Sequence, residues 1–139
     1  MIVLDTNVIS ALMRKEPEIP VVKWLDRQPA ASVWITAITV MEIRFGLQTM
    51  PKGRRQNALI SSFELMLKGM IEGRIASFDA EAAMHAAEVM AQRKRKGRSI
   101  EVRDTMIAGI VLANRAALAT RNTQHFEDLL LTVVNPWKM

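Results

Sequence analysis

The amino-acid sequence predicts an α/β protein built around a parallel sheet. Apolar runs of four or five residues alternate along the chain with longer segments of helical periodicity, which is typical of parallel strands joined by helices. A chain of 139 residues is also long enough to form one domain with a substantial core. Residues 1–139 contain no repeat, linker or low-complexity tract, so we expect a single domain.

The N-terminal third is expected to contain the first two strands and three helices. Met1–Leu4 is short and apolar, as in a buried parallel strand, and a polar turn leads into a helical pattern. Prolines at positions 17 and 20 break this helix and open the next one. The predicted elements after the first strand are a helix at Thr6–Met13, a helix at Val21–Gln28, a strand at Ser32–Ile35 and a helix at Ala37–Gln48.

Turn residues divide the rest of the chain. Pro51-Lys52-Gly53 predicts a turn before an amphipathic helix over residues 54–71. Asp79 is a suitable N-cap for an alanine-rich helix over residues 80–96, which Gly97 ends. The remaining predicted elements are strands at Arg74–Phe78, Ala117–Thr120 and Leu131–Val134, a helix at Val102–Arg115 and a polar loop at Arg121–His125.

Composition excludes several classes of protein. No apolar run approaches the ~20 residues of a membrane span, and the N-terminus lacks the pattern of a signal peptide, so we expect a cytoplasmic protein that contacts no membrane. The absence of cysteine excludes disulfides, thiolate nucleophiles and thiolate zinc sites. The only histidines, His85 and His125, lie forty residues apart and are expected to have no special role.

The net charge of +5 is concentrated in one part of the chain. Residues 49–103 carry eleven basic and six acidic side chains, whereas the flanking segments are balanced. The basic residues gather in two runs, residues 52–55 and 93–98, which are either solvated helix ends or a surface for a phosphate backbone. The candidate RNA-binding residues are Arg93, Lys94, Arg95, Lys96 and Arg121.

Two acids occupy positions where helices are expected to be apolar. Glu42 follows Ile38 by four residues and precedes Phe45 by three, so it is predicted to project from the buried face of its helix. The apolar stripe of the helix at Val102–Arg115 likewise extends back onto Asp104. Burial of an ionised carboxylate costs several kcal/mol unless it is paired or binds a cation.

Asp5 supplies a third acid at the end of the first strand, and Asn122 follows a later strand. Parallel sheets place their sites beyond the carboxyl ends of their strands, so these side chains are expected to converge. Converging carboxylates repel each other, and a hard divalent cation such as Mg²⁺ or Mn²⁺ relieves that repulsion. Such an ion beside a basic surface indicates a phosphate substrate.

Each acid also has a purely structural alternative. Asp5 would cap the following helix, and Asp104 would favour the first turn of its helix. Glu42 would form a buried ion pair. Its candidate partners are Arg44, Arg103 and Arg121. The threonines Thr6, Thr39 and Thr120 are expected to be hydrogen-bonding residues of structural importance.

Five segments together resemble the PIN-domain nucleases, and among them the VapC and FitB toxins of bacterial toxin–antitoxin modules. The segments are IVLDTNVIS, ITAITVMEIRFG, IEVRDTMIAG, LATRNTQHF and the terminal NPW, and they extend from Ile2 to Trp137. The resemblance implies a three-layer α/β/α sandwich with a short, mainly parallel sheet. It also implies metal-dependent cleavage of single-stranded RNA by a water nucleophile.

The resemblance assigns roles to individual residues. The three acids of the family match Asp5, Glu42 and Asp104, and the polar neighbour of the first acid matches Asn7. Many members carry a fourth acid where this chain has Asn122, so this position is only a weak metal ligand. Glu101, one turn before Asp104, is a candidate to assist, and Thr6 and Thr120 are candidates to support the ligands.

The resemblance also implies a protein partner. Toxins of this type are inhibited by a cognate antitoxin whose C-terminal segment lies across the active-site groove, and toxin dimers assemble with antitoxin dimers. The predicted helical hairpin around residues 51–53 resembles the place where that segment is held. The chain has few aromatic residues, and most of them are assigned to the core, so RNA recognition is expected to rest on shape and phosphate contacts. They are Trp24, Trp34, Trp137 and four phenylalanines.

Two other functions fit parts of the sequence. A haloacid-dehalogenase-type phosphatase would need a second aspartate two residues after Asp5, where this chain has Asn7. A binding module that holds RNA or an antitoxin and cleaves weakly is compatible with Asn122. RNA cleavage that requires Mg²⁺ or Mn²⁺ and stops with EDTA separates this module from an enzyme.

Overall fold

The computed structural model describes residues 1–139 and contains a five-stranded sheet in which every pairing is parallel, with the strand order β3-β2-β1-β4-β5. The strands are short because each one supplies only the few residues that are covered by helices. Their bounds are β1 Ile2–Leu4, β2 Val33–Thr36, β3 Ile75–Ala76, β4 Ala117–Ala119 and β5 Thr132–Val134.

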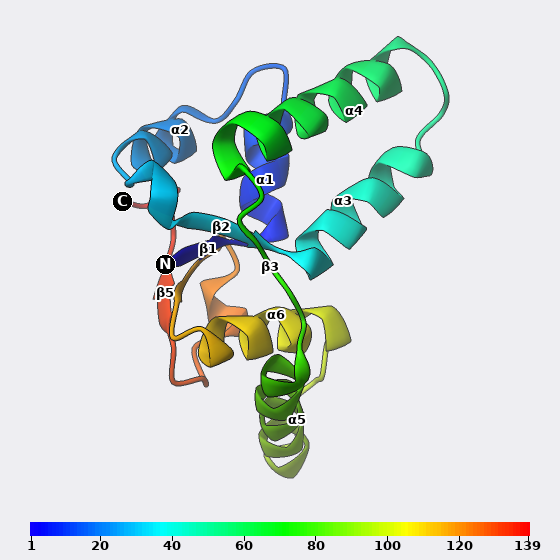
Figure 1. Ribbon diagram of the computed structural model, residues 1–139. Helices are drawn as coiled ribbons and strands as arrows, with labels where there is room; N and C mark the ends of the chain where they lie inside the picture. The colour runs from blue at the N-terminus through cyan, green and yellow to red at the C-terminus, as the bar shows by residue number, and fades with distance from the viewer.

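Six α-helices connect the strands (Figure 1). They are α1 Thr6–Met13, α2 Ile19–Asp26, α3 Ala37–Gln48, α4 Arg54–Met66, α5 Ala80–Arg95 and α6 Val102–Ala113. Helix α4 continues into a π-helical turn at Leu67–Ile71, and short 3-10 turns lie at Ala30–Ser32 and Thr123–His125. No helix combines the length and the apolar character that crossing a membrane requires.

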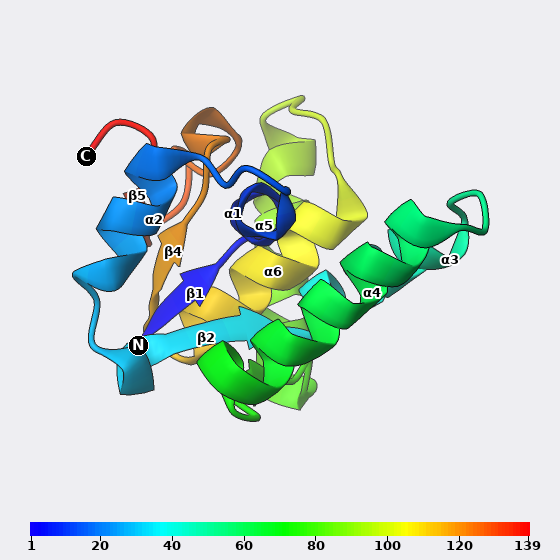
Figure 2. The ribbon, with the colours of Figure 1, turned by 90° about the horizontal axis from the view of Figure 1, so that it is seen from above.

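The sheet separates two hydrophobic cores, which confirms the three-layer α/β/α sandwich. Successive residues of a strand point to opposite faces, so Val3 belongs to the core under α5 and α6, whereas Leu4 belongs to the core under α1, α2 and α4. Figures 1 and 2 show the helices on the two sides of the sheet. The order in the sheet brings the carboxyl ends of β1 and β4 side by side.

Close packing of α5 against α6 fixes the helix that carries Asp104. A Cβ atom at Gly109 would collide with the backbone oxygen of Ala82 in α5 and with the side chain of Ala86. Glycine is therefore required where the two helices approach most closely. This contact sets the position of α6 relative to the sheet.

Several predicted bounds shift by one or two residues; α6, for example, ends at Ala113 and not at Arg115. Three differences have a clear physical reason. Helix α2 begins at Ile19, because Pro20 is accommodated in its first turn. Strand β3 is reduced to two residues, since it pairs only with β2 at the edge of the sheet. The predicted apolar face of α3 was wrong in part: Ile38 is buried as expected, but Phe45 is 67% exposed, and the helix also buries Ile43 and Leu47.

Candidate active site

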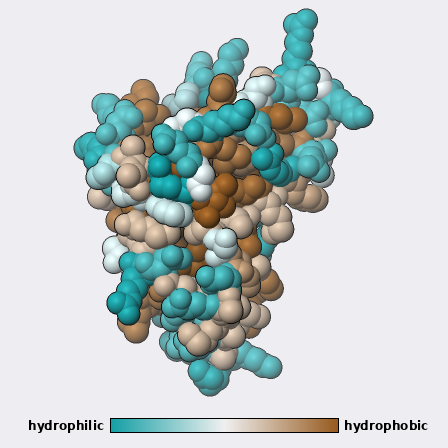
Figure 3. Space-filling view, viewed as in Figure 1, coloured by the Kyte–Doolittle hydropathy of each residue, from teal (hydrophilic) through white to brown (hydrophobic).

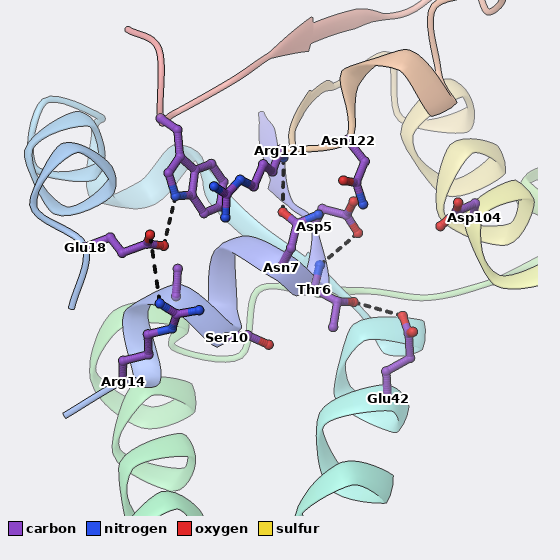
Figure 4. A pocket seen from close by; sticks show the side chains of 12 residues that line it. Asp5, Thr6, Asn7, Ser10, Arg14, Glu18, Glu42, Asp104, Arg121 and Asn122 are labelled. Carbon is purple, nitrogen blue, oxygen red and sulfur yellow. Dashed lines mark hydrogen bonds and ion pairs between the residues drawn. The ribbon is translucent and has the colours of Figure 1, made fainter. Parts of the chain in front are cut away.

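A pocket of about 400 Å³ opens at the carboxyl ends of β1 and β4 (Figure 4). It contains most of the residues that the sequence singled out. Those that line it are Asp5, Thr6, Asn7, Glu42, Asp104, Arg121 and Asn122. The sequence-based prediction missed Ser10, Arg14, Glu18 and Trp137, which line the same pocket.

Asp5 is both a helix cap and a residue of this pocket. It follows β1 directly, and its Oδ1 accepts a 2.8 Å hydrogen bond from the backbone N–H of Thr6 at the start of α1. Its Oδ2 accepts a 2.8 Å hydrogen bond from the hydroxyl of Thr120. With only 5% of its surface exposed, Asp5 keeps its two oxygens at the inner end of the pocket.

The pKa of Asp5 is raised above its ordinary value. Burial is the largest cause, and the hydrogen bonds from Thr120 and Thr6 oppose it by stabilising the charged form. The negative charges of Asp104 and Glu42 raise the pKa further. The three acids, which come from different elements, are therefore electrostatically coupled.

Glu42 faces the pocket from α3 and is partly buried, so the expectation that it projects from the buried face is met only in part. Its Oε1 accepts a 2.8 Å hydrogen bond from the hydroxyl of Thr6, and its side chain is 21% exposed. Among its three candidate arginine partners, Arg103 lies 3.5 Å from Oε2. Arg44 instead pairs with Glu64 at 2.7 Å.

Asp104 reaches the pocket from the first turn of α6. Its Oδ2 lies 3.2 Å from Nδ1 of His125, a residue that was expected from the sequence to have no special role. Neither residue is fully buried, since their side chains are 25% and 48% exposed. Asp104 is thus available on the pocket side while one of its oxygens contacts the loop that follows β4.

Glu101 caps α6 and is absent from the pocket lining. Its side chain accepts a 2.7 Å hydrogen bond from the backbone N–H of Asp104 and contacts Arg103 at 3.2 Å. Although the partial burial of Glu101 would raise its pKa, these hydrogen bonds and the charge of Arg103 lower it overall. Glu101 therefore supports Asp104 through its backbone and does not itself face the pocket.

Thr120 is the centre of a hydrogen-bond network behind Asp5. Its hydroxyl accepts from Nδ2 of Asn7 at 3.2 Å and from the backbone N–H of Asn122 at 3.1 Å, while it donates to Asp5. Asn7 also accepts a 3.2 Å hydrogen bond from the backbone N–H of Arg121. Asn7 therefore steadies the first acid through Thr120, and Thr120 links β4 to the start of α1.

The oxygen-rich lining suits a hard divalent cation in its chemistry. Carboxylates of Asp5, Glu42 and Asp104 and the amide of Asn122 all lie on one pocket. No three acidic or histidine side chains are gathered closely enough to hold one ion directly. Mg²⁺ commonly binds through one or two carboxylates and keeps several waters, so this donor set fits an ion that is held partly through water.

Arg93 differs from its neighbours in the basic run. It is 4% exposed, and its guanidinium contacts both carboxylate oxygens of Asp128 at 3.3 Å as well as the backbone oxygen of His125. The prediction that Arg93 binds RNA was wrong because this buried pair fixes the 125–128 segment. Lys94, Arg95 and Lys96 are exposed at the end of α5.

Comparisons with known proteins agree with this geometry. The chain matches the model of the PIN domain over residues 2–129. It is 42% identical over 138 residues to the plasmid stability protein StbB of Pseudomonas syringae pv. tomato and 41% identical over 138 residues to the VapC ribonuclease Y4jK of Sinorhizobium fredii. In both cases 99% of each chain is covered. The crystal structure of FitAcB from Neisseria gonorrhoeae contains a chain that is 36% identical and has a TM-score of 0.91, with 100% of both chains covered.

Proposed function

The chain belongs to the PIN-domain family and is related to its VapC and FitB members, and we propose that it is a metal-dependent endoribonuclease toxin. The observation that carries the proposal is the pocket at the ends of β1 and β4, where acids from three elements face one cavity. A relative that is 41% identical over nearly its whole length is a VapC ribonuclease, which supports RNA as the substrate.

The proposal includes a bound divalent metal ion. Asp5 and Asp104 would hold a Mg²⁺ or Mn²⁺ ion together with bound water, with Glu42 beside them and Asn122 as a weaker ligand. The ion would polarise the phosphoryl oxygen and lower the pKa of the attacking water.

Residues that contact the acids would support the reaction by orienting them and by favouring their charged forms. Thr120 and the backbone N–H of Thr6 donate to the two oxygens of Asp5 and favour its charged form, which a cation requires. The hydroxyl of Thr6 orients Glu42 through Oε1. Arg103 neutralises part of the charge of Glu42 in the absence of a cation.

Single-stranded RNA is the proposed form of the substrate. The pocket is open on the surface of the sandwich, and its lining includes Arg14 and Arg121 as well as the acids (Figure 4). A flexible strand can bend a phosphodiester into such a pocket and leave its bases free for other contacts. A regular duplex would keep those bases paired.

We further propose that a cognate antitoxin docks on the hairpin formed by α3 and α4. Met41, Phe45 and Leu65 are 51%, 67% and 71% exposed, so these two helices present several large apolar side chains to solvent. Figure 3 shows hydrophobic surface over this part of the molecule. An amphipathic segment of the antitoxin lying on this hairpin would pass beside Glu42 and the pocket. In the complete complex, we expect the toxin to be a dimer.

An RNA cleavage assay tests the enzymatic part of the proposal. The parent should cleave single-stranded RNA with Mg²⁺ or Mn²⁺, should stop with EDTA, and should lose activity when Asp5→Asn removes the charge. Asp26→Asn, an exposed acid in α2, is the matched control and should remain active. If the parent binds RNA or the antitoxin but never cleaves with either metal, the chain is a binding module.

A further inference from the structure

We infer that the side chains of Arg121 and Trp137 form a stacking subsite for one unpaired nucleobase of the RNA, next to the acids. The inference rests on the proposed ribonuclease function and adds a recognition element to it. The guanidinium carbon of Arg121 lies 5.1 Å from the centre of the Trp137 ring, and both residues line the pocket (Figure 4). Trp137 is half-buried, because it packs against the hydrophobic core under α1 and α2 and also lines the pocket.

Trp137 is held by two hydrogen bonds, one from its indole ring and one from its backbone. Its Nε1–H donates a 2.9 Å hydrogen bond to Oε2 of Glu18, and its backbone N–H donates a 3.0 Å hydrogen bond to Oδ1 of Asn135. Both groups are satisfied without a ligand, so the ring does not need to move to bind one. A fixed aromatic surface loses little conformational entropy when a base stacks against it.

The guanidinium group of Arg121 contacts the ring, while other residues pair with the acids of the pocket. Glu42 pairs with Arg103, Asp104 contacts His125, and Glu18 lies 3.9 Å from Arg14. Arg121 is exposed to solvent, so its planar group is accessible at the pocket. Planar guanidinium groups and aromatic rings are the surfaces on which proteins stack unpaired bases.

The backbone of Arg121 fixes the subsite relative to the chemistry. Its N–H donates to Oδ1 of Asn7, and the preceding residue, Thr120, donates its hydroxyl to Asp5. A base stacked on Arg121 and Trp137 would therefore belong to a nucleotide adjacent to the phosphodiester at the acids. Such a contact recognises a base and would position the strand for cleavage.

The test measures binding in EDTA, so that it depends on neither metal nor cleavage. The probes are a short single-stranded RNA and the same RNA with one abasic residue placed at each position in turn. For the parent, one abasic position should weaken binding by roughly five- to hundredfold, the range expected for loss of one stacked base. Trp137→Leu should weaken binding of the intact RNA by a similar factor and should bind that abasic RNA with no further loss.

Two further variants keep the test decisive if Trp137→Leu folds poorly. Trp137→Phe retains a ring and should retain most of the binding. Stacking on Trp137 should quench tryptophan fluorescence when RNA is added to the parent, and this quenching should be lost in Trp137→Phe. Arg121→Lys keeps the charge, and hence the salt dependence of binding, but loses the planar surface and should respond less to the abasic residue.

Several outcomes would overturn the inference. One is that no abasic position affects the parent, and another is that Trp137→Leu weakens the intact and abasic RNAs equally, which would indicate a purely structural role. A failure of the nuclease proposal is distinguishable, because it would appear as absent cleavage with Mg²⁺ while the position-specific abasic effect persists in EDTA.

Discussion

The hydroxyl of Thr120 donates a 2.8 Å hydrogen bond to Oδ2 of Asp5 and so joins the end of β4 to the acid that follows β1. This bond opposes the effect of burial, which is the main cause of the raised pKa of Asp5. A hydrogen bond to a charged group contributes about 1.5–3 kcal/mol. Thr120 is thus expected to control how readily Asp5 is ionised. A cation binds the ionised form of this carboxylate.

Replacing Thr120 tests this dependence. Thr120→Val keeps the shape but removes the donor, so the pKa of Asp5 should rise further and Mg²⁺ affinity at neutral pH should fall by roughly tenfold or more. Thr120→Ser keeps the hydroxyl and should behave like the parent. Calorimetric titration of Mg²⁺ into each folded protein measures the difference. Equal affinities for the Val and Ser variants would contradict a role for the hydroxyl.

The exposed basic residues at the end of α5 are expected to bind phosphates. Replacing Lys94, Arg95 and Lys96 with Gln, while the buried Arg93 is kept, should weaken RNA binding and reduce the slope of log affinity against log salt. The slope should fall by roughly 0.7 for each phosphate of a single strand that the protein no longer neutralises. Binding measured in EDTA over a range of salt concentrations gives the slope. If the slope does not change, these side chains are only a solvated helix end.

Asn122 offers a test of the metal-binding part of the pocket. Its side chain lines the pocket and supplies an uncharged amide beside the acids. Asn122→Asp should raise Mg²⁺ affinity by adding a negative charge, and should lower the melting temperature in EDTA because the charge repels the other acids. Asn57→Asp, an exposed change in α4, is the matched control. No gain in affinity would place residue 122 outside the coordination sphere.

Much of the fold could be predicted because local patterns determine it. The helices at Thr6–Met13 and Ala37–Gln48 have the predicted bounds, since each follows an apolar strand and begins at a capping side chain. The buried face of α3 could not be predicted in the same way. Its apolar residues lie around most of the helix, so only tertiary packing decides that Ile43 is buried and Phe45 is exposed.

The acids were predictable and their surroundings were not. Asp5 follows a strand and Asp104 lies in the first turn of a helix, as the sequence predicted, and both line the pocket together with Glu42 from the middle of α3. Arg93 looks like its neighbours in the sequence, because its partner Asp128 is 35 residues away and only the packed loop brings the two together. The position of Trp137 likewise depends on how the chain returns to the pocket after β5, and no local pattern encodes that return.

The pair formed by Arg93 and Asp128 predicts a pH dependence of stability. Burial would raise the pKa of Asp128, but the hydrogen bonds and charge of Arg93, with a contribution from Arg98, lower it overall. A lowered pKa in the folded protein stabilises the fold above the ordinary value near 3.8, and this stabilisation disappears as pH falls through the folded pKa.

Asp128→Asn should therefore lower stability at pH 7 and much less at low pH. The side chain of Asp128 is 7% exposed, so the loss at pH 7 should reach about 3 kcal/mol, the lower end of the cost of breaking a buried pair, because Asn keeps one acceptor oxygen. Denaturant unfolding between pH 7 and pH 3 measures the change. A difference that is independent of pH would show that Asp128 acts through packing and not through its charge.

Asp104→Asn separates a metal ligand from a structural acid. Glu101 caps α6, so Asp104 is not needed as a cap, and the substitution removes only the charge of Asp104 and weakens its contact with Nδ1 of His125 at 3.2 Å. That contact is half exposed and contributes about 1 kcal/mol at most, and relief of repulsion with Asp5 offsets it, so the variant should melt in EDTA close to the parent.

Mg²⁺ at a hundredfold excess over its Kd should stabilise the parent by about 2.7 kcal/mol and the Asp104→Asn variant far less, with RNA cleavage almost abolished. Thermal melts of both proteins in EDTA and in Mg²⁺, beside one cleavage assay, measure these effects. A variant that is clearly less stable in EDTA yet still cleaves RNA would rule out Asp104 as a ligand, because its charge would then serve the fold and not the reaction.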